Sequence, residues 1–205
     1  MWDNVLPILL GFVLTTVIGG VFASFLQQRS WRNQNEVRLR EEDRQKASDV
    51  CQRLSGLVDK RLYRMQRLLW AVVAHADGRL SIDAVSGRLR DYDEVLLEWN
   101  DQLNARLAVV GAYFGRDVRD FLDKVVYEAF KEAGQHLEGL YRQVVGVEGA
   151  QVSDGAVDTA TAKIGHLNGL AYQLSVTMMV RVREERVGRA APGVLDEETL
   201  SDQLP

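Results

Sequence analysis

The sequence predicts an all-α protein, in which an N-terminal transmembrane helix continues into a cytoplasmic up-down four-helix bundle. Three observations predict this class. Residues 5–26 carry no charge, residues 27–188 contain no proline, and apolar residues of the bundle recur in steps of three and four. Such steps are the repeat of an amphipathic helix, whereas the period of two that marks strands is rare here. At 205 residues, the chain is long enough for one domain with an appendage.

These patterns divide the chain into five segments. They are an extracytoplasmic N-terminus (1–4), a transmembrane helix (5–26), a charged juxtamembrane helix (27–49), a four-helix bundle (50–188) and a flexible acidic tail (189–205).

The transmembrane helix is predicted from length and flanks. Residues 5–26 are 22 uncharged residues, enough to cross ~30 Å of hydrocarbon at ~1.5 Å per residue. Trp2 and Trp31 flank the segment, as aromatic residues do at membrane interfaces. A cleaved signal peptide is the alternative, with a small-residue site at 21–23. Signal peptides have a basic start and a shorter apolar core, whereas this chain starts with Asp3 and no base, which favours an anchor.

Charge sets the expected orientation. The residues that follow the segment include four arginines against one acid, Glu36: Arg29, Arg32, Arg38 and Arg40. The positive-inside bias therefore places the N-terminus outside and the bundle in the cytoplasm of a bacterial inner membrane. Cys51, the one cysteine, is then in a reducing compartment and is expected to be a small core residue.

Small residues mark one face of the transmembrane helix. Gly11, Thr15, Gly19 and Ala23 recur every four residues. This spacing lets helix backbones approach closely in lipid, so the face is predicted to mediate self-association. The alternative is that glycine and threonine are simply common in membrane helices.

Four helices are expected in the cytoplasmic part. They run from Gln27 to about His75, from Ser81 to Phe114, from Arg116 to about Val145, and from about Ala156 to Val187. Asp77-Gly78 and Gly115 are expected to end helices, and 146–155 is the longest loop. Ser81 and Asp83 are both candidate N-caps for the second helix. The third stripe of apolar residues is expected to include Val118, Leu122, Val125, Ala129, Ala133, Leu137, Leu140 and Val144.

No motif indicates catalysis, a cofactor or a metal. Phosphate-loop, nucleophile-elbow and His-Glu-x-x-His patterns do not occur. The Glu-x-x-His pairs of di-metal bundles are missing, because none of the three histidines follows a glutamate by three residues. Glu128, Glu132 and His136 align along one helix and could hold a single ion, but a solvated polar face is the preferred interpretation. The chain is predicted not to be an enzyme.

Basic residues are concentrated on the first bundle helix. Lys60, Arg61, Arg64 and Arg67 lie close together with only Asp59 opposing them, so they are a candidate surface for an anionic ligand, an oligonucleotide or lipid headgroups. The alternative is a solvated face paired with acidic residues of the second and third helices.

A polar cluster interrupts the second helix. It consists of Glu98, Trp99, Asn100, Asp101 and Asn104, and Asn and Asp are poor in helix interiors unless their side chains find partners. The cluster is predicted to be either a contact with a ligand or another subunit, or a buried polar network that fixes helix register.

Two stretches carry a resemblance: RLYRMQRLLWAV (61–72) and EVLLEWNDQLNARLAVVGAYFG (94–115). They are similar to stretches of bacterial membrane-anchored helical proteins. The layout, with one N-terminal span and a cytoplasmic bundle, resembles that of small effectors of bacterial anti-phage defence, with the Hailong-type channel effector as the nearest analogue. The resemblance implies an oligomeric membrane channel that a nucleic-acid oligomer controls. It carries over no functional residue.

Two functions follow as hypotheses. The first is a homo-oligomeric, channel-forming or membrane-disrupting effector that a ligand at the bundle controls. The second is a membrane-tethered scaffold, in which a cytoplasmic protein docks on the bundle or the acidic tail.

Overall fold

The computed structural model describes residues 5–145 and 152–191, and of residues 5–26 and 190 it describes only the backbone. All described elements are helical: α1 (Val5–Ala76), α2 (Ile82–Asn100), α3 (Leu103–Phe114), α4 (Arg116–Phe121), the π-helix η1 (Leu122–Val126), α5 (Tyr127–Val145), α6 (Asp154–Arg183) and the 3₁₀-helix η2 (Gly188–Ala190). The predicted all-α class is confirmed.

The chain divides into two compact units, Met1–Glu42 and Asp43–Pro205. In the first unit, side chains from residue 27 onward are exposed or half-buried, as expected for a helix that is polar all round. Trp31 is 67% exposed, and Arg38 pairs with Glu42 one turn later at 3.5 Å. Among the residues searched for a membrane span, no helix is both long and apolar enough to cross a bilayer. The segment predicted to do so, 5–26, lies outside the described side chains.

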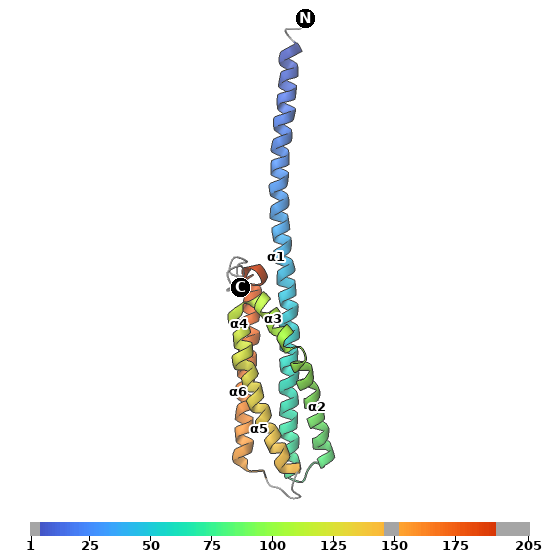
Figure 1. The fold of residues 1–205 in the computed structure, drawn as a ribbon, viewed down its shortest axis with the longest axis vertical. Helices are drawn as coiled ribbons and strands as arrows, with labels where there is room; N and C mark the ends of the chain where they lie inside the picture. The colour runs from blue at the N-terminus through green and yellow to red at the C-terminus, as the bar shows by residue number, and fades with distance from the viewer. Residues whose placement is uncertain (1–4, 146–151, 192–205) are drawn as a thin grey trace, which may run out of the picture. The chain divides into compact units, whose positions relative to one another are not determined.

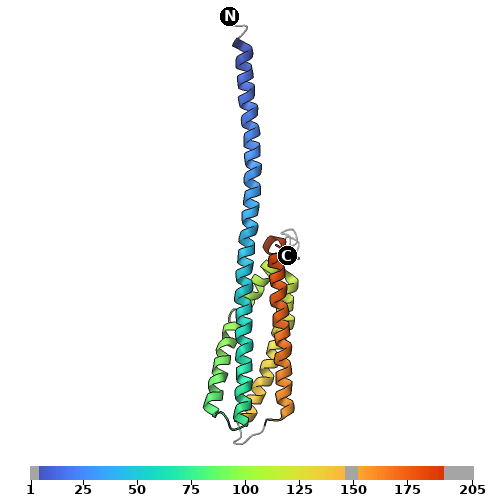
Figure 2. The ribbon, with the colours of Figure 1, turned by 180° about the vertical axis from the view of Figure 1, so that it is seen from behind.

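The second unit contains four helical runs that alternate in direction (Figures 1 and 2). The runs are the part of α1 from Asp43 onward, then α2 with α3, then α4 with η1 and α5, and finally α6. Hydroxyl contacts join neighbouring runs, with Ser55 of α1 2.8 Å from Ser175 of α6 and Ser86 of α2 3.2 Å from Tyr141 of α5. Short connections between antiparallel helices are typical of up-down bundles.

One continuous core fills this unit. It includes Cys51, which is 7% exposed, and six residues of α6: Ala160, Ile164, Leu167, Ala171, Leu174 and Met178. Burial raises the pKa of the Cys51 thiol, so this cysteine behaves as the small apolar residue that the sequence predicts.

The third stripe differs from its prediction at two positions, while its other six residues are buried as predicted. Val126 and Phe130 are fully buried, whereas Val125 is 40% exposed and Ala129 is half-buried. The π turn of η1 is the cause, because a π turn holds one residue more than an α turn and rotates the following side chains. The predicted assignment of Val125 and Ala129 to the buried stripe is wrong for this reason.

The second helix is broken, and its prediction as one helix over 81–114 is wrong. α2 ends at Asn100 and α3 begins at Leu103, with a turn at Asp101 and Gln102. The side chains around the turn are exposed. Asn and Asp compete for backbone hydrogen bonds outside helices, so this sequence favours a break.

The expected helix ends at both sides of this run are confirmed. The hydroxyl of Ser81 accepts a hydrogen bond from the amide of Ala84 and caps α2, while Gly115 separates α3 from α4 with a φ of 88°. A positive φ of this size suits glycine, which has no Cβ. Gly115 therefore fixes the point at which the chain reverses.

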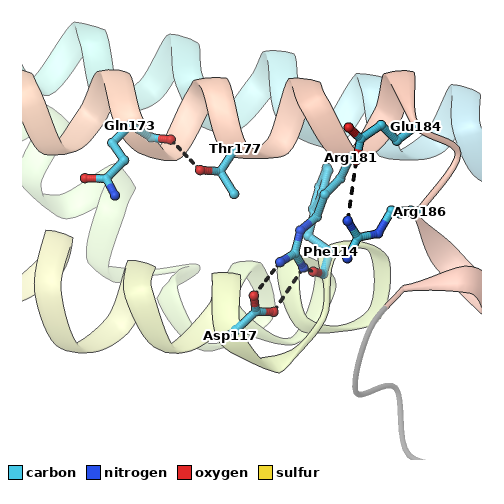
Figure 3. Close-up of polar contacts among 7 residues, drawn as sticks. All are labelled: Phe114, Asp117, Gln173, Thr177, Arg181, Glu184 and Arg186. Atoms are coloured by element: carbon cyan, nitrogen blue, oxygen red, sulfur yellow. Dashed lines mark hydrogen bonds and ion pairs between the residues drawn. The ribbon is translucent and has the colours of Figure 1, made fainter.

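Arg181 of α6 holds this reversal in place (Figure 3). Its guanidinium donates hydrogen bonds to the carbonyl of Phe114 and to both carboxylate oxygens of Asp117, one of them at 3.0 Å. The side chain of Arg181 is 11% exposed. The hydrogen bonds from Arg181 lower the pKa of Asp117.

The lowered pKa of Asp117 gives stability a dependence on pH. A carboxyl group with a lower pKa in the folded state contributes stability above its unfolded pKa of about 4, and the contribution is lost as pH falls through the folded value. We expect Asp117→Asn to reduce the drop in Tm between neutral pH and about pH 3, as measured by circular dichroism. Glu98 and Asp120 also have lowered pKa values, so part of the drop remains. An unchanged drop would contradict the role of Arg181.

The end of the described chain folds back on the bundle. α6 ends at Arg183, before the expected end at Val187, and η2 packs against α3. The amide of Arg189 donates a hydrogen bond to Asp43 at 3.4 Å. A Cβ at Gly188, where φ is 59°, would lie 2.6 Å from the Asp43 carboxylate. Residues 146–151 and 192–205, which hold most of the predicted loop and acidic tail, lie outside the described residues.

Candidate functional site

A groove of about 550 Å³ opens between α1 and the α2–α3 break. Its apolar lining consists of Val50, Leu54, Gly56, Leu57, Ala105, Val109 and Val110, and its polar lining of Arg53, Lys60, Glu98, Gln102 and Arg106. A Cβ at Gly56 would meet no atom within 4 Å, so the missing side chain contributes to the open space. The volume falls within the range of small-molecule sites.

The rim of the groove has an excess of positive charge. Three cations line it with a single carboxylate, Glu98, which pairs with Lys60 at 2.6 Å. The hydrogen bond from Lys60 lowers the pKa of Glu98. Arg53 forms no ion pair with a described residue, and Nη1 of Arg106 is buried without a hydrogen-bond partner there. An apolar floor with unneutralised cations above it suits an anion attached to an apolar body.

A buried cation lies directly behind the rim. Arg61 is 2% exposed, and its guanidinium carbon lies 5.3 Å from the ring centre of Trp99 and 4.4 Å from that of Phe130. Its Nε and Nη1 have no hydrogen-bond partner among the described residues. Burial lowers the pKa of Arg61, and the hydroxyl of Tyr92 partly opposes this shift. The two rings stabilise the cation by cation–π interaction, but a buried charge without a carboxylate partner destabilises a fold.

The rim and the buried cation are linked through the chain. Lys60 and Glu98 form the rim pair, while the next residue after each, Arg61 and Trp99, forms the buried contact. The broken end of α2 lies immediately after this pair.

The structure does not bring the four predicted basic residues to one surface. Lys60 is on the groove rim and Arg61 is in the core. Arg64 pairs with Asp91 of α2 at 2.8 Å, and Arg67 lies over the ring of Tyr63. For Lys60 and Arg64, the alternative interpretation of pairing with acidic residues of the second helix is confirmed.

The predicted polar cluster is also divided. Trp99 is buried, Glu98 is on the rim, and Asn100, Asp101 and Asn104 are exposed at the helix break. Its interpretation as a buried polar network is wrong, because the break turns these three side chains toward solvent. A contact with another subunit stays a prediction.

The aligned Glu128, Glu132 and His136 do not form an ion site. Glu128 pairs with Lys131, Glu132 with Lys163, and Nε2 of His136 lies 3.1 Å from the carbonyl oxygen of Ala156. Among the described residues, no group of three metal-ligating side chains is close enough to hold a metal. The self-association face of Gly11, Thr15, Gly19 and Ala23 lies outside the described side chains.

Gly56 is a groove residue that the sequence does not predict, because a glycine on a helix gives no signal of a groove. The proximity of Arg53 and Arg106 in the groove depends on the break between α2 and α3. Comparison of the chain with protein-family models, curated proteins and solved structures found no match.

Proposed function

We propose that this protein is a non-enzymatic effector of bacterial defence, anchored in the inner membrane by residues 5–26, with its bundle in the cytoplasm. It homo-oligomerises, forms a channel, and is controlled by an anionic ligand with an apolar body. The observation that carries the ligand-binding part is the groove, whose floor is apolar and whose rim holds three cations against one carboxylate.

The contacts at the rim suggest how a ligand acts. An anionic group in the groove competes with Glu98 for Lys60, whose 2.6 Å contact joins α1 to the end of α2. Losing this contact loosens α2 beside the buried pair of Arg61 and Trp99. A ligand shifts such an equilibrium only by its difference in affinity for the two states. The ligand binds more tightly to the state in which Lys60 is released from Glu98, because in the other state the Glu98 carboxylate competes with it for Lys60.

The membrane part of the proposal comes from the sequence. The uncharged segment has the length to cross a bilayer, and the face of Gly11, Thr15, Gly19 and Ala23 has the spacing of helices that associate in lipid. The resemblance to defence effectors favours a channel, and a nucleic-acid oligomer combines phosphate charge with flat bases, as the groove requires.

The groove is tested with anilinonaphthalene sulfonate, an anionic aromatic dye that fluoresces in apolar surroundings. We expect Gly56→Leu in the full chain to weaken dye binding by about tenfold or more, because the added side chain fills the space that the ligand needs. Gly139→Leu is the control, since a Cβ at Gly139 also meets no atom within 4 Å and this residue is not part of the groove. Equal dye binding by the two variants would contradict the assignment.

A membrane-tethered scaffold is the second candidate. Tyr172, Val176 and Met179 of α6 are exposed, and their steps of four and three form one apolar stripe on the helix. Exposed aromatic and methionine side chains are typical of protein contacts. This stripe favours a docked helix and is independent of the groove.

A further inference from the structure

The groove that the proposed function assigns to a ligand is also complementary to a segment of this chain. Residues 192–205 contain four acids and no base: Asp196, Glu197, Glu198 and Asp202. Three leucines lie among them, at 195, 200 and 204. The groove has the opposite charge at its rim and an apolar floor. We infer that residues 192–205 bind in this groove within the same chain and compete with the ligand.

Two arginine side chains of the groove lack the acidic partners that the segment would supply. Arg53 forms no ion pair with a described residue, and Nη1 of Arg106 lacks a hydrogen-bond partner among them. Carboxylates at these two positions would provide the missing partners, and charge-assisted hydrogen bonds are about twice as strong as neutral ones. Lys60 already holds one carboxylate, that of Glu98, and has further hydrogens to donate.

The described chain ends near enough for this contact. η2 packs against α3, which forms one wall of the groove, and Arg189 contacts Asp43 of α1, which forms the other. From Asp43, the far end of the groove at Lys60 is 17 residues away along α1, or about 26 Å. The 14 residues from 192 to 205 extend to about 46–50 Å. The segment can therefore reach the groove and lie along it.

Because the segment belongs to the same chain as the groove, weak contacts are enough to hold it there. A short tether gives the segment an effective concentration in the millimolar range, so a few exposed ion pairs and leucine contacts suffice. A free ligand must then displace a segment that is present at this effective concentration. This inference rests on the proposed function of the groove and adds a segment of the same chain that competes with the ligand.

Zero-length carbodiimide cross-linking of the full wild-type chain tests the inference. The reagent joins a carboxylate to an amine in direct contact, and the chain has five lysines: Lys46, Lys60, Lys124, Lys131 and Lys163. By mass spectrometry, we expect amide links from Glu197, Glu198 or the neighbouring aspartates to Lys60. Links to Lys131 and Lys163, which lie on other helices and pair with Glu128 and Glu132, serve as the internal control.

Two further measurements test whether Arg53 and Arg106 bind the segment, and whether the segment belongs to the same chain as the groove. Exchange of Arg53 and Arg106 for glutamine is expected to lower the Lys60 product by about three- to tenfold, the range for loss of two exposed charge contacts. In a mixture of chains with light and heavy nitrogen, the links are expected within single chains only.

Three results would overturn the inference: equal yields at Lys60, Lys131 and Lys163, a Lys60 yield unaffected by the arginine exchanges, or links between chains, which would assign the groove to the segment of a second copy. If one of these occurs while Gly56→Leu still weakens dye binding, only this inference fails. If Gly56→Leu also fails to weaken dye binding, the proposed ligand-binding function of the groove is contradicted as well.

Discussion

Replacing Trp99 with alanine is expected to lower the free energy of unfolding of the bundle by about 3–5 kcal/mol, the range for truncating a buried aromatic residue. Trp99 is 1% exposed, and its ring centre lies 5.6 Å from that of Phe130. Alanine leaves a cavity at this position and removes one of the two rings that face the buried Arg61. Both effects act in the same direction. Urea denaturation followed by circular dichroism measures the change.

Trp70→Ala is the matched control. Trp70 belongs to the same bundle but is 61% exposed, and exposed substitutions usually change stability by less than about 0.5 kcal/mol. Trp99→Phe keeps an aromatic face toward Arg61 and is expected to cost less than alanine. Similar, small losses for Trp99→Ala and Trp70→Ala would contradict the position of Trp99 at the centre of the core.

The helical periodicity of the sequence was sufficient to predict most of the core. Most of the apolar residues that recur in steps of three and four along α1 and α6 are buried, from Leu54 to Val72 and from Ala160 to Met178. The π turn at Leu122–Val126 was not predictable, because an added residue in one turn leaves no trace in composition. The break at Asp101 and Gln102 had a signal in the Asn and Asp residues around it, but that signal also fitted a buried network.

Arg61 shows where reasoning by residue type fails. It lies three residues after Val58 and four before Met65, both buried, so its position along the helix belongs to the inner face. Charged residues are almost never fully buried unless they are paired, and this rule assigned Arg61 to the surface with Lys60. Only the tertiary contacts with Trp99 and Phe130, far along the chain, reveal how the fold accommodates the cation. The groove likewise depends on contacts between distant segments.

The largest functional effect is expected from replacing both Gly11 and Gly19 with leucine. Helices in lipid gain little from the hydrophobic effect, so their association depends on close backbone packing, which two bulky side chains on the same face prevent. Leucine keeps the segment apolar, so insertion is expected to be unchanged. The bundle, whose core lies in residues from Ala47 onward, is expected to stay folded.

Val13→Leu with Val17→Leu is the matched control. The helical repeat of about 100° per residue places these two positions away from the face of Gly11 and Gly19, and the substitutions introduce the same residue type, leucine. Flotation of the vesicles on a density gradient checks that each variant is inserted to the same extent.

Dye release from phospholipid vesicles that contain the purified full chain is the most direct test of the proposed channel. The wild-type chain and the valine variant are expected to release a self-quenched dye, whereas Gly11→Leu with Gly19→Leu abolishes release at equal insertion. Full release by the glycine variant, or no release by the wild-type chain with and without anionic ligands, would contradict the channel and leave the tethered scaffold as the function of this protein.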